Sequence, residues 1–332
     1  MSTYRTLKGY NIKSFTTNPT NLKEGQIWYN STQGGVKVSP NVTAGAWSSG
    51  ANIPKVFQQP GSSRLGTQNA MAIYGAGPYP ATSNETLEYD GSSWTAGGDM
   101  NTARTLVNGS TGTLTAALAF GGFTPPPMSN KTEHYDGTSW TNGGNLSGSS
   151  KYNSGGSGTL TAALSCGGNA NPPFQLVETE EYDGSSWTSG GNLNTGRTGG
   201  GSAGTQTASL YAGGTTQARS EEYNGSSWTE GNDLSKPRRV KGGGFGTQTA
   251  AIMAAGDGYS PADNTLAGLC EQYDGTSYST LAQLGSNLYE RRGGGAGTTT
   301  AGILAGGGPG HNLVEEWNNP SPRVGIRELD VT

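Results

Sequence analysis

Short apolar runs alternate with polar, glycine-containing turns along most of the chain. One recurring run of small apolar residues ends in a pair of glycines, as at residues 116–122, 162–168 and 208–214. A second run ends in Tyr-Asp, and a third begins at a tryptophan. No apolar period of 3.6 residues persists and glycine disfavours helix, so the pattern predicts β-strands separated by tight turns.

The strongest signal is a repeated segment of the form Glu-Tyr-Asp-Gly-Ser-Ser-Trp. It occurs at residues 88–94, 133–140, 181–187, 222–228 and 273–278, with a degraded copy at 315–318. Tyr89 and Trp317 are 228 residues and five repeats apart, a mean period of about 46 residues. The recurring aromatic residues are predicted to be structural: Tyr89, Trp94, Tyr135, Trp140, Tyr182, Trp187, Tyr223 and Trp228.

Each repeat contains four predicted strands. They are a Gly-rich strand a, a strand b that ends in the glycine pair, a strand c that ends in Tyr-Asp and a strand d that starts at tryptophan. Asp-Gly-Ser-Ser predicts a tight c–d turn, because glycine accepts a positive φ and aspartate binds its own backbone. A repeated four-stranded unit predicts a β-propeller, with the small residues of strand a near the central axis.

The two ends of the repeat region complement each other. The strand at Trp47 has no strand c before it, and the strand at Trp317 has no strand d after it. Together they supply one full unit. The sequence therefore predicts six blades, closed by pairing of the N- and C-terminal strands.

The order of these features resembles the kelch repeat: an apolar strand, Gly-Gly, a variable loop, Tyr-Asp, a tryptophan and then an arginine. The resemblance covers roughly residues 41–318, although strand a carries Ala and Gly in place of bulkier residues. It implies an all-β, six-bladed kelch-like β-propeller. The expected organisation is an N-terminal arm at residues 1–40, the propeller at 41–319 and a C-terminal tail at 320–332.

The N-terminal arm differs in pattern from the repeats. Residues 26–32 and 36–38 predict a β-hairpin around a Ser-Thr-Gln-Gly-Gly turn. The string Glu-Gly-Gln-Ile-Trp-Tyr-Asn-Ser-Thr at 24–32 resembles segments of bacteriophage tail and fibre proteins, and the repeats resemble proteins of marine phages. An isolated hairpin is marginally stable in water, so residues 1–40 are expected to bind other virion proteins or copies of the chain.

Composition and charge exclude several classes of function. The net charge is −4 and no basic run occurs, so the chain lacks the electrostatic footprint of a nucleic-acid-binding protein. No segment reaches the roughly 18 apolar residues of a spanning helix, and the N-terminus lacks the apolar region of a signal peptide. We therefore expect synthesis in the cytoplasm without membrane insertion, and the resemblance to phage proteins implies a final location in the virion.

Residues for catalysis or metal binding are scarce. Two cysteines and two histidines are too few for a disulfide framework or a usual copper site, so we expect no metal and no cofactor.

His134 replaces the Glu or Gln of other repeats and is interpreted as a solvent-exposed strand residue. Cys166 is interpreted as a small core residue. The recurring acids of Glu-x-Tyr-Asp are interpreted as structural. The GxGxxG match at 199–204 precedes a strand, which favours blade architecture over a dinucleotide site.

The connections between strands b and c differ in every repeat, whereas the turns on the opposite face are nearly uniform. Variation confined to one face is typical of a recognition surface, with drift in tolerant loops as the alternative. The candidate glycan- or protein-binding residues on these loops are Tyr79, Phe123, Phe174, Tyr259 and His311.

Together these features predict a non-enzymatic structural protein of a phage virion, in the tail, a fibre or another appendage. It would display the propeller for attachment or for binding a host-surface glycan or protein, and it would be oligomeric on the particle. Two alternatives remain open: a carbohydrate-active oxidase of the kelch family, and a cytosolic kelch adaptor for protein interactions.

Overall fold

The chain folds into two compact units that contain almost no helix. The computed structural model describes residues 4–7, 10–17, 27–32, 35–38, 45–77, 81–105, 107–124, 128–170, 174–215, 217–257, 266–285, 293–308, 311–319 and 327–329. One unit comprises Ala46–Asn318, and the other comprises Met1–Gly45 with Asn319–Thr332. Helical geometry in the described residues is confined to the 3-10 turn η1 (Lys241–Gly243) and to Leu266, so no described helix has the length of a membrane span.

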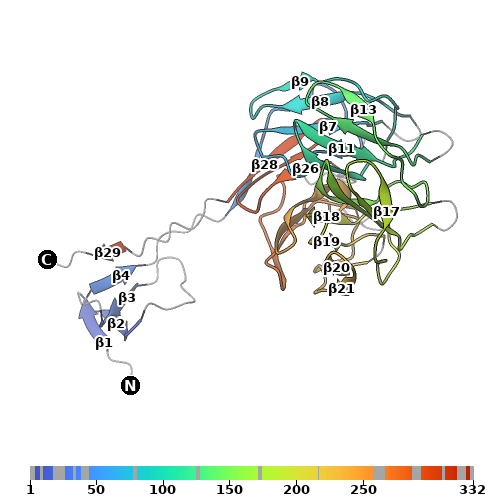
Figure 1. Ribbon diagram of the computed structural model, residues 1–332. Helices are drawn as coiled ribbons and strands as arrows, with labels where there is room; N and C mark the ends of the chain where they lie inside the picture. The colour runs from blue at the N-terminus through green and yellow to red at the C-terminus, as the bar shows by residue number, and fades with distance from the viewer. Residues whose placement is uncertain are drawn as a thin grey trace. The chain divides into compact units, whose positions relative to one another are not determined.

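The larger unit contains six four-stranded antiparallel sheets, in which the predicted strands a to d follow one another (Figure 1). The first sheet is β6 (Gly61–Ser62), β7 (Met71–Tyr74), β8 (Thr86–Tyr89) and β9 (Trp94–Ala96). The second is β10 (Ser110–Thr113), β11 (Ala116–Phe120), β12 (Thr132–Tyr135) and β13 (Trp140–Asn142). The third is β14 (Gly155–Thr159), β15 (Ala162–Cys166), β16 (Thr179–Tyr182) and β17 (Trp187–Ser189).

The last three sheets follow the same order. The fourth is β18 (Gly201–Gly204), β19 (Ser209–Ala212), β20 (Ser220–Tyr223) and β21 (Trp228–Glu230). The fifth is β22 (Gly244–Thr247), β23 (Ala250–Ala254), β24 (Cys270–Tyr273) and β25 (Tyr278–Thr280). The sixth is β26 (Gly294–Gly297), β27 (Ala301–Ala305), β28 (Val314–Asn318) and β5 (Ala46–Ser49).

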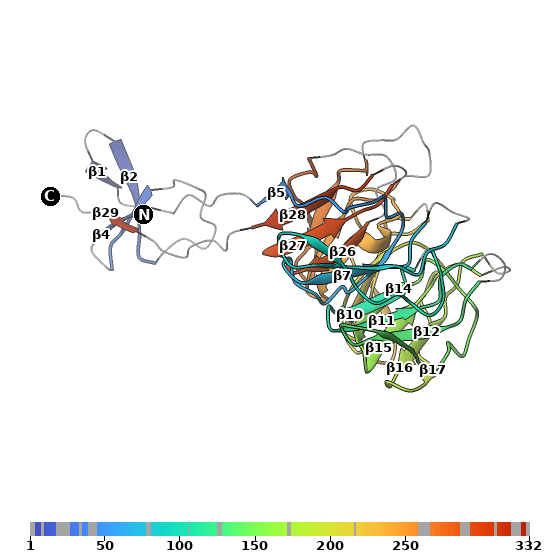
Figure 2. The same ribbon diagram turned by 90° about the horizontal axis from the view of Figure 1, so that it is seen from above.

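The sixth sheet joins the two ends of the repeat region. Strand β5 pairs antiparallel with β28, and Trp47 lies opposite Trp317 with ring centroids 5.4 Å apart. Figure 2 shows the blue β5 beside the red β28. The first strands of successive sheets contact one another, and β26 contacts β6. The larger unit is therefore a β-propeller, and the expected pairing of N- and C-terminal strands is present.

Small residues in the first strands allow neighbouring sheets to approach closely. A Cβ atom added to Gly156 would lie 2.5 Å from the carbonyl oxygen of Ser110 in the preceding sheet. A Cβ added to Gly244 would lie 2.6 Å from the backbone nitrogen of Ser202. Any larger side chain at these positions would force the sheets apart, which explains the Gly, Ala and Ser content of strand a.

One cation fills the centre of the ring. The guanidinium of Arg64 is fully buried, and it donates to the carbonyl oxygens of Asn108, Ser110 and Gly244 at 2.9 to 3.1 Å. These acceptors belong to the second and fifth sheets, so Arg64 of the first sheet links the first strands of two sheets that are not neighbours. Burial lowers the pKa of Arg64 to about 10.

Aromatic residues of strands c and d hold neighbouring sheets together. The tryptophan indoles donate to threonine hydroxyls of the preceding sheet, each at 2.9 Å: Trp140 to Thr86, Trp187 to Thr132 and Trp228 to Thr179. Phe120 packs edge-on against Trp187, with ring centroids 4.8 Å apart. Trp140, Trp187 and Trp228 are therefore buried at contacts between sheets, where their rings pack and their indole N–H groups find acceptors.

A buried ion pair recurs in four sheets. A cation before strand a pairs with the first glutamate of Glu-x-Tyr in strand c: Arg104 with Glu133, Lys151 with Glu180 and Arg197 with Glu221, each at 2.8 Å, and Arg238 with Glu271. All eight side chains are at most 2% exposed. The recurring glutamate therefore ties the connection that enters each sheet to the third strand of that sheet.

His134 is not the solvent-exposed residue that the sequence predicts. It is half-buried, and its Nε2 lies 2.8 Å from the hydroxyl of Tyr182 in the next sheet. The prediction was wrong because a strand position that faces outward from one sheet faces the neighbouring sheet in a ring. Cys166 is buried as expected, and it forms no disulfide with Cys270.

The smaller unit has its own five-stranded sheet. Its strands are β1 (Tyr4–Leu7), β2 (Tyr10–Phe15), β3 (Ile27–Asn30), β4 (Gly35–Val38) and β29 (Arg327–Leu329), in that spatial order. Strands β3 and β4 form the expected hairpin, β2 and β3 are parallel, and Trp28 is fully buried. The C-terminal segment supplies β29, which pairs antiparallel with β4.

Candidate binding pocket on the loop face

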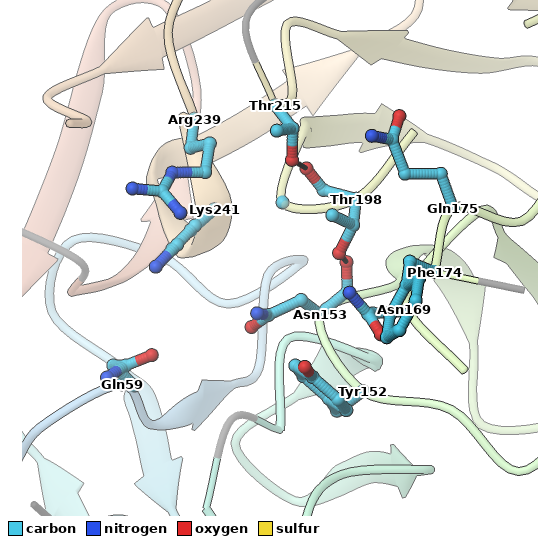
Figure 3. A pocket seen from close by; sticks show the side chains of 11 residues that line it. Gln59, Tyr152, Asn153, Asn169, Phe174, Gln175, Thr198, Thr215, Arg239 and Lys241 are labelled. Carbon is cyan, nitrogen blue, oxygen red and sulfur yellow. Dashed lines mark hydrogen bonds between the residues drawn. The ribbon is translucent and has the colours of Figure 1, made fainter. Parts of the chain in front are cut away.

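A pocket of about 460 Å³ lies where connections from several sheets converge. Its lining side chains, shown in Figure 3, come from segments that precede first strands or follow second strands of the sheets. These are the b–c and d–a connections, the face that the sequence predicts to be variable. The lining residues are Gln59, Tyr152, Asn153, Asn169, Phe174, Gln175, Thr198, Gly199, Thr215, Arg239 and Lys241, hereafter the loop-face pocket.

Equivalent positions of four repeats contribute to this pocket. Gln59, Asn153 and Gly199 each lie two residues before the first residue of β6, β14 and β18, and Lys241 begins the turn η1 before β22. All four have a positive φ, at 54°, 53°, 74° and 51° respectively. The same left-handed backbone bend therefore directs the connections into the first, third, fourth and fifth sheets toward one place, and in three of them it presents a side chain.

The two cations of the pocket share one carboxylate. Arg239 donates two hydrogen bonds to the carboxylate of Asp257, at 2.9 and 3.0 Å. The ammonium of Lys241 lies 3.9 Å from the same carboxylate, and its side chain is 3% exposed. Because Asp257 is fully buried, it holds both cations at one wall of the pocket and offsets one of their two positive charges.

The polar residues differ in how fully they are satisfied. Asn153 accepts a hydrogen bond from the side-chain amide of Asn108 at 2.9 Å, and the hydroxyl of Thr215 donates to the carbonyl oxygen of Thr198 at 3.2 Å. By contrast, the buried amide oxygens of Gln59 and Asn169 have no hydrogen-bond partner within the described part of the chain. Such unpartnered acceptors are uncommon, because a buried polar atom without a partner costs about 1–3 kcal/mol.

The structure places three of the five loop residues singled out from the sequence. Phe174 lines the pocket and is 65% exposed. Phe123 packs edge-on against Tyr152, a lining residue, with ring centroids 6.1 Å apart. His311 is half-buried and is not among the lining residues. Tyr79 and Tyr259 lie outside the described residues.

Sequence reasoning missed most of the pocket. Gln59, Asn153 and Lys241 precede the first strands of their sheets, at or next to the position where the repeat before β18 carries Gly199. That departure from glycine was the available signal, but its meaning depends on backbone angles that the sequence does not display. The described residues contain no cluster of three or more His, Cys, Asp or Glu side chains able to hold a metal ion.

Comparison with known proteins bears on the fold. No protein-family model matches the chain, and no curated protein matches it. The solved structure of YjhT is similar, with a TM-score of 0.60 and 14% sequence identity, over 81% of this chain and 96% of that chain. At this identity the likeness supports the propeller architecture alone.

Proposed function

We propose that the chain is a non-enzymatic structural protein of a phage virion, in which a six-bladed propeller of the kelch type binds the host surface. The observation that carries this proposal is the loop-face pocket, which lies among the loops that vary between repeats. Phe174 stands at this pocket with 65% of its surface exposed. An exposed aromatic side chain beside a polar cavity is typical of a recognition surface.

Features of the sheets support the proposed blade count and repeat type. Six four-stranded sheets, contacts between successive first strands and the pairing of β5 with β28 all fit a closed ring of six blades. The Tyr-Asp and Trp positions of each repeat, followed by the buried Arg or Lys, fit the kelch pattern. The buried ion pairs give that arginine a physical role in the blade.

The smaller unit supports attachment to a particle. It has its own sheet with a fully buried tryptophan, Trp28, and both terminal segments of the chain contribute strands to it. We propose that this unit binds other virion proteins or further copies of the chain, so that the propeller is displayed in several copies and remains free to bind a glycan or protein.

Two measurements test the proposal. Mass spectrometry of purified particles should detect the chain, and purified protein should compete with particles for adsorption to host cells. Phe174→Ala should weaken that competition and change stability by less than about 0.5 kcal/mol, because the side chain is mostly exposed. Val177→Ala is the matched control, since this exposed residue follows Phe174 closely and does not line the pocket. Absence of the chain from particles, or full competition by the Phe174 variant, would contradict the proposal.

A further inference from the structure

We propose that the loop-face pocket binds one sugar unit of about hexose size, with the amide oxygens of Gln59 and Asn169 accepting hydrogen bonds from its hydroxyl groups. The inference deepens the proposed function, on which it rests, by naming the ligand class and the residues that hold it. It is carried by three observations: strained backbone at the pocket, unpartnered acceptors inside it, and the chemistry of its walls.

The backbone strain is concentrated at the pocket. Among the described residues, four that are not glycine have a positive φ, and three of them line this pocket: Gln59, Asn153 and Lys241. Glycine adopts this conformation without strain, and Gly199 does so at the equivalent position of another repeat. A glycine would therefore relieve the strain at the other three positions. Side chains that persist in a strained backbone indicate a function at the site.

Two acceptors in the pocket lack donors. The side chain of Gln59 is 6% exposed, and its Oε1 has no partner in the described structure; Oδ1 of Asn169 is likewise buried without a partner. In Figure 3 the amide oxygen of Gln59 points toward the other lining residues. A ligand that brings hydroxyl donors would satisfy both oxygens, whereas an anion, which only accepts hydrogen bonds, would satisfy neither.

The walls favour a neutral, hydroxyl-bearing ring over a phosphate. Both cations face the carboxylate of Asp257, which offsets one of their two positive charges and engages two N–H donors of Arg239. Phe174 and Tyr152 offer aromatic faces on which the C–H face of a sugar ring can pack. The volume of about 460 Å³ lies within the range of small-molecule sites and is large enough for one sugar ring of hexose size.

Binding of simple glycosides by the purified full-length chain tests this inference. The probes are the methyl glycosides of glucose, galactose, mannose and N-acetylglucosamine, followed by saturation-transfer NMR and by calorimetric titration. At least one is expected to bind. Gln59→Gly should weaken that binding about fivefold, the loss expected for one hydrogen bond, and should leave the melting temperature unchanged or raised because the strain is relieved.

A matched control separates strain from binding. Ala255, with a φ of 59°, is the fourth strained residue and does not line the pocket, so Ala255→Gly should relieve strain and leave glycoside binding unchanged. Asn169→Ala removes the second unpartnered oxygen and gives an independent variant, for which the loss of one hydrogen bond should likewise weaken binding about fivefold. Failure of all four glycosides to bind, or binding by both pocket variants as tight as in the unaltered chain, would overturn the inference.

The two proposals fail separately. A chain that is absent from particles but binds a glycoside through Gln59 contradicts the virion role and supports the sugar site. A chain that is present in particles but binds no glycoside contradicts the sugar site and supports the virion role.

Discussion

In four sheets a tyrosine hydroxyl binds a glutamate of the preceding sheet, and for Tyr182 of the third sheet His134 takes the place of that glutamate. The tyrosine–glutamate pairs are Tyr89 with Glu316, Tyr135 with Glu88, Tyr223 with Glu181 and Tyr273 with Glu222. Tyr182 instead meets the ring of His134 at 2.8 Å. Between the second and third sheets, the contact therefore depends on a side chain whose charge changes near neutral pH.

This contact predicts a pH dependence of stability. Burial lowers the pKa of His134 below its ordinary value of 6.5, so the unfolded chain binds the proton more readily than the folded one. The free energy of unfolding should therefore decrease as the pH falls through about 6.5. His134→Gln keeps an acceptor for Tyr182 and cannot titrate there. Urea unfolding between about pH 7.5 and 5.5 should show a smaller decrease for the variant, and an equal decrease in both proteins would contradict the assignment.

At the scale of single elements, the c–d turn shows how one side chain shapes a hairpin. The carboxylate of Asp183 accepts hydrogen bonds from the backbone N–H groups of Ser185 and Ser186, both at 2.8 Å, and Gly184 has a φ of 95°. These donors hold the pKa of Asp183 well below its ordinary value. In the fourth sheet, Asn224 accepts the same pair of bonds from Ser226 and Ser227 without any charge.

The natural Asn224 turn suggests a direct test. A carboxylate whose pKa is lowered by folding stabilises the protein above its unfolded pKa, and this contribution is lost as the pH falls below about 3.8. Asp183→Asn should keep the turn and reduce the loss of stability in acid, with little change at neutral pH. Asp183→Ala removes the acceptor and should destabilise at every pH. Unfolding midpoints at about pH 7 and pH 3 measure both effects, and identical behaviour of the Asn and Ala variants would contradict this account.

The buried ion pair is the second element-scale feature. Arg197 and Glu221 are at most 2% exposed, and Arg197 also donates to the carbonyl oxygen of Arg219 at 2.8 Å. Arg197→Met should destabilise by about 3–5 kcal/mol, because it leaves a buried carboxylate without its cation. Arg197→Lys should cost less, since Lys151 fills the equivalent place in the third sheet. Equal losses in the two variants, measured by urea unfolding, would show that packing rather than charge is responsible.

The sequence predicts the strands and turns better than it predicts the contacts between residues that are distant in the sequence. Tyr182 and Trp187 could be assigned to strands because turn residues separate them in every repeat. Arg197 and Glu221 were each visible in the repeat, but nothing local showed that they meet, because the fold alone brings a connection against the third strand. The loop-face pocket is still harder to predict from the sequence. Gln59 and Lys241 are far apart in the chain and converge because four sheets bend the same way at one face.

At the scale of the molecule, the propeller depends on a strand that lies far from its partner in the sequence. Strand β5 has four residues, and its partner β28 would become an exposed edge without it. Exposed edges favour aggregation, and Trp317, which is fully buried, would lose its contact with Trp47. The junction between the chain ends is therefore expected to govern the stability of the whole ring.

Two truncations separate this junction from the smaller unit. Removing residues 1–44 and 320–332 leaves β5 and all six sheets, so the product should unfold cooperatively and remain monomeric, but should no longer incorporate into particles. Removing residues 1–50 and 320–332 takes β5 as well, and should lower the unfolding midpoint strongly or cause aggregation. Urea unfolding and size-exclusion chromatography compare the two products. If both unfold at the same midpoint, β5 does not close the ring. If the longer product also fails to fold, the propeller requires the smaller unit.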